Sequence, residues 1–227
     1  MKRILGILSF VGCAALFIGL VAMYLFAQST PAPVLAAQVD GVVTTSQGVL
    51  PHAFLELNTY PDGEAPENFN SDHSPHSDWV SYGPSTTLQV PAHSLVTIQI
   101  TNYDGGEVLN NDFFASVRGV EGQAIMNGQP FTSISPEHVG HTFTLRPAPA
   151  NTTSDLFVSV PLQAVAEEDM PESGYTTKPN VVTFSFVVGE PGEFFWNCEY
   201  PCGDGTYAKF GSAMSAMRYM AGTLTVV

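Results

Sequence analysis

The chain has 227 residues, with 7 Lys and Arg against 21 Asp and Glu, and a formal net charge of -14. This acidic balance argues against nucleic-acid binding, which needs a basic face to release counterions from phosphate. Because 44% of the residues are hydrophobic and only 12% are charged, the composition also argues against long disorder. The 20 glycines and 17 prolines favour strands joined by many turns.

The N-terminus has the character of a membrane anchor. Lys2 and Arg3 precede an unbroken apolar run over residues 4–27, which as a helix would be about 36 Å long and would span a bilayer core of about 30 Å. The alternative is a cleaved signal peptide, with a small-residue site at residues 35–37. The run exceeds the usual apolar region of a signal peptide, which favours a retained anchor. We therefore predict a single-pass protein of the cell membrane, with the C-terminal domain extracytoplasmic.

Residues 31–85 are predicted to be a linker and N-terminal extension after an anchor over residues 1–30. The extension starts in a Pro-rich segment, is mixed in pattern over residues 51–85, and includes an exposed loop over residues 68–79 with two histidines. This division leaves residues 86–227 as the folded domain.

Strand patterns become strong in that domain. Apolar residues alternate with polar ones, which is the period of a half-buried strand, within residues 88–90, 96–101, 141–145, 182–188 and 222–227. Residues 156–160 and the aromatic run that starts at residue 194 are interpreted as further strands. Many short strands separated by Gly and Pro turns predict a mainly β fold, a Greek-key β-sandwich or barrel with antiparallel strands, after one N-terminal transmembrane helix.

A group of sulfur and imidazole side chains falls at the ends of these strands. Cys198 and Cys202 follow an aromatic strand, His141 begins an earlier strand, and Met220 precedes the last one. Thiolate, imidazole and thioether ligands together suit copper. The alternative for Cys198 and Cys202 is a disulfide across a tight turn, which an oxidising compartment would favour.

Residues 192–226 resemble the C-terminal ligand loop of cupredoxins, and are most similar to the copper-A domain of cytochrome c oxidase subunit II. That family shows Gly-x-aromatic-x-x-x-Cys-x-x-x-Cys-Gly, and the places fall here on Gly192, Phe194, Cys198, Cys202 and Gly203. Met-x-Gly before the last strand is similar to residues 220–222, and the family's His-Ser/Thr-Phe is similar to residues 141–143.

The resemblance implies a cupredoxin-like domain that binds one or two copper ions through His141, Cys198, Cys202 and Met220. It also implies electron transfer, as or beside a subunit II-like component of a respiratory complex, or with another redox protein. Such a chain is at most an electron-transfer subunit of an oxidoreductase complex. The sequence contains no Gly-x-Ser-x-Gly elbow, His-Glu-x-x-His helix or phosphate loop that would indicate an independent hydrolase.

One ligand of the family pattern is missing. The second histidine should stand four residues after the second cysteine, where the chain has Thr206, and the methionine should stand where it has Lys209. Met220 follows only after an insertion over residues 210–219. A second imidazole would have to come from the remaining candidates His73, His76, His93 or His138. Two further hypotheses therefore stay open, an accessory or assembly subunit with a lost or incomplete site, and a Cu(I) delivery protein.

Overall fold

The computed structural model describes residues 2–29, 32–61, 79–106, 110–172, 174–202 and 213–227, which form an N-terminal helix and a separate β-sandwich. Helix α1 (Lys2–Ser29) is almost wholly apolar, and its segment Ser9–Phe26 has a mean hydropathy of 2.2. By length and composition it is long enough to cross a membrane, and an N-terminal signal sequence has the same character.

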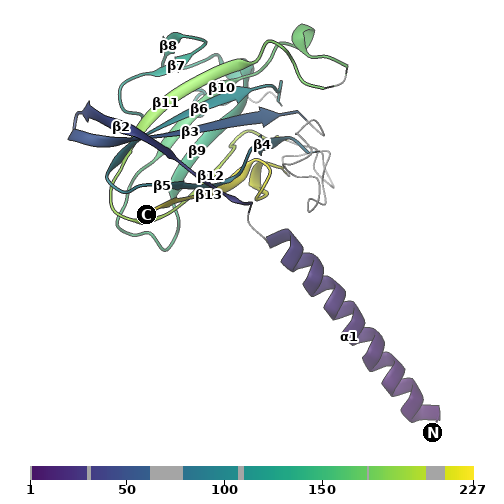
Figure 1. The fold of residues 1–227 in the computed structure, drawn as a ribbon. Helices are drawn as coiled ribbons and strands as arrows, with labels where there is room; N and C mark the ends of the chain where they lie inside the picture. The colour runs from purple at the N-terminus through teal and green to yellow at the C-terminus, as the bar shows by residue number, and fades with distance from the viewer. Residues whose placement is uncertain (1, 30–31, 62–78, 107–109, 173, 203–212) are drawn as a thin grey trace. The chain divides into compact units, whose positions relative to one another are not determined.

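Two sheets face each other in the β-sandwich (Figure 1). The first sheet has the strand order β1 (Val34–Ala36), β5 (Thr87–Val90), β13 (Ala221–Val226), β12 (Gly192–Asn197), β9 (Val139–Pro147) and β10 (Val158–Gln163). The second has the order β2 (Gln38–Thr45), β3 (Gly48–Tyr60), β6 (Ser94–Asn102), β11 (Asn180–Val188), β7 (Ala124–Met126) and β8 (Gln129–Phe131), with β4 (Ser81–Gly83) paired to β3. In the described part of the chain, short 3-10 turns lie between strands at η1 (Pro136–His138), η2 (Glu167–Asp169) and η3 (Ala213–Ser215).

The core forms where the apolar faces of the two sheets meet. Every second residue of β11 from Val182 to Val188 is buried, as the period of two requires. Phe184 on β11 packs against Phe143 on β9, with ring centroids 5.5 Å apart, and Phe143 stacks on Trp196 of β12 at 5.0 Å. The contact between Phe184 and Phe143 joins the two sheets, and the two-sheet arrangement confirms the predicted β-sandwich.

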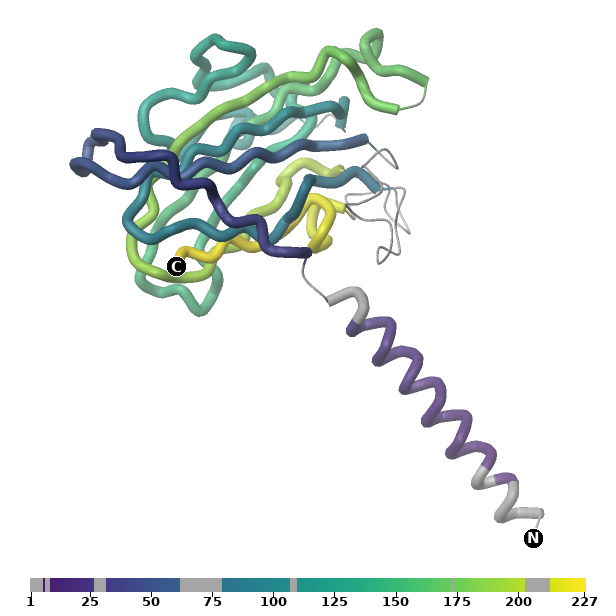
Figure 2. The backbone as a smooth tube through the Cα atoms, in the orientation of Figure 1, coloured from purple at the N-terminus to yellow at the C-terminus, as the bar shows by residue number. Residues whose placement is uncertain are grey.

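The structure differs from the predicted division of the chain, because residues of the supposed linker 31–85 lie within the sheets. Strand β3 pairs with β6 from His52 to Thr59, and β1 pairs with β5. In Figure 2 the dark-blue part of the chain runs from β1, in the first sheet, to the hairpin of β2 and β3, in the second sheet. The buried side chains of Ala53, Leu55 and Leu57 alternate with less buried neighbours, which is a strand signal inside the segment interpreted as mixed. The predicted loop 68–79 lies outside the described residues apart from Trp79.

The strand directions also differ from the antiparallel prediction. Strand β13 pairs parallel with β5, as do β1 with β5 and β3 with β6. A parallel pair needs a long crossover connection, and the alternation of side chains along a strand is the same in both directions. Alternation in the sequence therefore predicts the strands and leaves their pairing undetermined.

Candidate metal centre

Three predicted ligands meet at one end of the first sheet. Strand β12 ends at Asn197 and runs antiparallel to β9, so Cys198 comes to lie beside the start of β9, where His141 stands. The ligand atoms of His141, Cys198 and Cys202 all lie within 4.8 Å of one another. All three side chains are buried, and Nδ1 of His141 lies 3.7 Å from Sγ of Cys198. Cys198 and Cys202 are both free cysteines in this arrangement.

The turn that carries the two cysteines is bound to strands on both sides. The backbone N–H of Cys198 donates to the carbonyl oxygen of Met220 at 2.8 Å, which ties the turn to the start of β13. The N–H of Thr142 donates to Sγ of Cys198 at 3.4 Å, and the N–H of Glu199 donates to the hydroxyl of Thr142 at 2.8 Å. The sulfur of Cys198 is therefore held in place by the sheet.

Met220 is fully buried, and its carbonyl oxygen accepts the hydrogen bond from the Cys198 N–H. This places the residue beside the turn, and ligation by its thioether stays a prediction. Thr206 and Lys209, where the family pattern has its other ligands, lie outside the described residues. Of the predicted insertion 210–219, the described part starts with η3 (Ala213–Ser215).

The other described histidines stand away from this group. His93 is exposed and lies 3.6 Å from Glu190. It stands at the start of β6, whose nine residues span about 30 Å, and the metal centre is at the other end of that strand. His138 is exposed at the end of η1. His52 bonds to Asp40 and Thr97 on the second sheet. His73 and His76 lie outside the described residues. Within the described part of the chain, His141 is thus the one imidazole at the two sulfurs.

Burial and mutual contact shift the pKa values of all three groups. Burial by itself lowers the pKa of His141, but the hydrogen bonds and charges of Asp104 and Cys198 raise it to about 10. Burial raises the pKa of Cys198, yet its bonds from Cys202 and His141 bring it well below the ordinary value. Burial and the neighbouring Cys198 thiolate raise the pKa of Cys202. Because metal ligands must be deprotonated, binding a metal at this centre would release protons.

This donor set fits copper. Two cysteine sulfurs are the soft ligands that Cu(I) prefers, and imidazole suits both copper oxidation states. The three ligand atoms are close enough to share one ion or a pair of ions, and their burial keeps water from competing. His141, Cys198 and Cys202 are the residues that would hold the metal.

Asp104 is part of this centre and was missed by the sequence analysis. Its Oδ2 lies 2.8 Å from Nε2 of His141, on the far side of the ring from Cys198. The sequence Asp104-Gly105-Gly106 is typical of an ordinary polar turn after a strand. No local signal separates such a turn from one that contacts a ligand.

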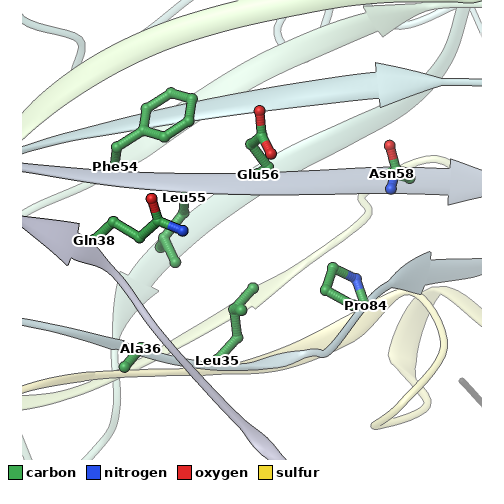
Figure 3. Close-up of a pocket in the computed structure, with 8 residues that line it drawn as sticks. All are labelled: Leu35, Ala36, Gln38, Phe54, Leu55, Glu56, Asn58 and Pro84. Atoms are coloured by element: carbon green, nitrogen blue, oxygen red, sulfur yellow. The ribbon is translucent and has the colours of Figure 1, made fainter.

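A second feature is a groove of about 260 Å³ between β1 and β3 (Figure 3). It is lined by Leu35, Ala36, Gln38, Phe54, Leu55, Glu56, Asn58 and Pro84. None of these side chains offers a sulfur or an imidazole, and the groove is not part of the metal centre.

No protein-family model and no curated protein matches the chain. Among solved structures, the chain is similar to auracyanin B at 15% identity, over 87% of this chain and 99% of that one, with a TM-score of 0.34. It is similar to the copper protein rusticyanin at 10% identity, over 92% and 94% of the two chains, with a TM-score of 0.35. A multicopper oxidase is similar at 13% identity, over 84% and 45%, with a TM-score of 0.29. These likenesses are too remote to decide the function, which has to be inferred from the geometry of the centre.

Proposed function

We propose that the protein is a membrane-anchored, extracytoplasmic copper protein of the cupredoxin kind that transfers electrons. The observation that carries this proposal is the buried group of His141, Cys198 and Cys202, with ligand atoms within 4.8 Å. The resemblance of residues 192–226 to the cupredoxin ligand loop also supports the proposal, because the two cysteines of that sequence pattern are the two cysteines of the buried group.

The protein's contribution is a fixed set of ligands. Bound copper would supply one-electron exchange, and electron transfer is fast when the ligands move little between oxidation states. The N–H of Thr142 on the Cys198 sulfur and the backbone bond from Cys198 to Met220 hold the turn before any metal binds. Because the two cysteines are buried, water has little access to their sulfurs, and the ligands of a bound metal would be protein side chains.

The membrane and the partner belong to the same proposal. Helix α1 is retained as the anchor, and the sandwich works outside the cytoplasm as or beside a subunit II-like component of a respiratory complex. The apolar length of α1 and the copper-A resemblance of the ligand loop support this placement. The net charge of -14 favours a redox partner with a basic docking face.

Copper loading of the full chain in detergent tests the proposal. The loaded protein is expected to show an intense thiolate-to-copper absorption band and a copper signal in electron paramagnetic resonance. Cys198→Ser should abolish the band, because it removes a ligand sulfur. Cys13→Ser is the matched control, since it also replaces a free cysteine, but one that lies in α1 and does not belong to the group of His141, Cys198 and Cys202. A band that survives Cys198→Ser, or disappears with Cys13→Ser, would contradict the assignment.

A second candidate function is Cu(I) delivery, or an accessory role with an incomplete site. The observation that favours it is the single imidazole at the sulfurs in the described part of the chain. A colourless protein that binds only Cu(I) would support delivery. A protein that takes up no copper would support the accessory role.

A further inference from the structure

The carboxylate of Asp104 lies directly behind the histidine of the centre. Its Oδ2 is 2.8 Å from Nε2 of His141, whose side chain is fully buried, while the Asp104 side chain is 14% exposed. The other ring nitrogen, Nδ1, faces the Cys198 sulfur at 3.7 Å. The imidazole is therefore held between a carboxylate and a cysteine, with one nitrogen committed to each.

Asp104 is itself held by a network at the end of β6. The side chain of Asn102 accepts from the Asp104 N–H at 3.2 Å and donates to the Asp104 carbonyl oxygen at 2.9 Å. The same amide donates to the carbonyl oxygen of Gln163 at 2.7 Å, and the N–H of Val165 donates to that of Asp104 at 3.1 Å. These bonds fix the backbone of Asp104 at the C-terminal end of β10, and from that position its carboxylate contacts His141.

Two glycines bring this turn against the strand that carries the histidine. A Cβ on Gly106, whose φ is +68°, would lie 2.6 Å from the carbonyl oxygen of Gly140. A Cβ on Gly140 would lie 2.6 Å from the carbonyl oxygen of Gly105. Only glycine at both places lets the turn approach the residue before His141 so closely. The contact between Asp104 and His141 is thus built by the backbone on both sides.

We propose that Asp104 is a positioning residue of the copper centre, which presents Nδ1 of His141 to the metal and favours the more oxidised ion. The proposal rests on the proposed function. By accepting a hydrogen bond from the Nε2–H group of His141, the carboxylate leaves Nδ1 as the free ligand atom and fixes the ring plane. Its negative charge beside a ligand in a buried site stabilises Cu(II) more than Cu(I), because the attraction grows with the charge of the ion.

The test compares Asp104→Asn and Asp104→Ala with the wild type, as full chains in detergent. Asp104→Asn keeps the shape and an acceptor oxygen but removes the charge. It should lower the preference for Cu(II) over Cu(I) about tenfold, which is a rise of about 59 mV in reduction potential for one electron. Asp104→Ala also frees the ring, and it should lower copper affinity by a further 10-fold to 100-fold, on the order of a lost outer contact.

Asp112→Asn is the matched control, because Asp112 is an exposed residue whose charge acts on Tyr200, and among the described residues its carboxylate forms no hydrogen bond or ion pair with His141, Cys198 or Cys202. Potentials come from redox titration and affinities from competition with a Cu(I) chelator, and circular dichroism shows that each variant is folded. If Asp104→Asn does not fold, Asp104→Glu replaces it, since the longer side chain keeps the charge while displacing the carboxylate, and should weaken affinity about tenfold.

The two levels of the proposal fail in different ways. Wild-type protein that binds copper, with Asp104 variants equal to Asp112→Asn in potential and affinity, would overturn the positioning role alone. Wild-type protein that takes up no copper would overturn the proposed function, and the role of Asp104 with it. A change in melting temperature without a change in potential would also count against the positioning role, because a merely structural contact gives that result.

Discussion

Replacing Gly222 by alanine should loosen the sandwich beside the metal centre. Gly222 is the second residue of β13 and pairs with Trp196 of β12 on one side. On the other side a Cβ would lie 1.9 Å from the carbonyl oxygen of Thr86 and 2.7 Å from its carbon. The N–H of the next residue, Thr223, donates to that same oxygen at 3.0 Å, which draws the two chains together. The glycine of the Met-x-Gly pattern is therefore required by a close backbone approach.

The cost follows from this geometry. An ordinary carbon contact needs about 3.5 Å, so β13 and the segment before β5 must separate by well over 1 Å to admit the methyl group. Overpacking of this kind costs about 1–3 kcal/mol, and losing the Thr223 bond adds about 1 kcal/mol. For a domain of this size each kcal/mol lowers the melting temperature by about 2–4 °C. Gly222→Ala should therefore melt roughly 10 °C below the wild type.

Thermal unfolding followed by circular dichroism measures this shift. Gly189→Ala is the matched control, because a Cβ there meets nothing within 4 Å and the backbone is not in the left-handed region. The control should melt within about 2 °C of the wild type, as surface substitutions usually do. A Gly222→Ala protein that melts with the control would show that β13 and Thr86 are not as close as the structure has them.

Three further predictions concern the centre, the core and the outer face of the second sheet. Met220→Leu should keep the copper absorption band and shift the reduction potential, because a thioether is a weak ligand; loss of the band in a folded variant would show a different role. Phe143→Ala should lower the free energy of unfolding by about 3–5 kcal/mol in denaturant titration, since the ring is fully buried between the sheets, and a loss below about 1 kcal/mol would contradict that packing. Thr97→Val should cost about 1 kcal/mol in the same titration, because the hydroxyl bonds to His52 and Ser185, each at 2.8 Å; an unchanged midpoint would mean that these bonds contribute nothing.

Local patterns in the sequence predicted much of the fold and part of the site. The alternation along residues 182–188 depends only on which face of a strand is buried, and β11 has that burial. The two cysteines and their strand are close in sequence, so their spacing alone placed them at a strand end. His141 was added by a three-residue resemblance to a known family.

The tertiary structure decided which distant residues meet. Asp104 reaches His141 across 37 positions in the sequence, and nothing in its polar turn distinguishes it from other turns. Strands β1 and β3 are part of the sheets, although the sequence analysis interpreted their segment as a linker. Strand β13 pairs parallel with β5, which the alternation of its residues does not indicate. Periodicity reports the environment of a residue along its own strand, while the partner across a sheet or between sheets is chosen by the packing of the whole core. For this reason the sequence determined the sandwich and its thiol pair, and only the folded chain determined the carboxylate behind the histidine.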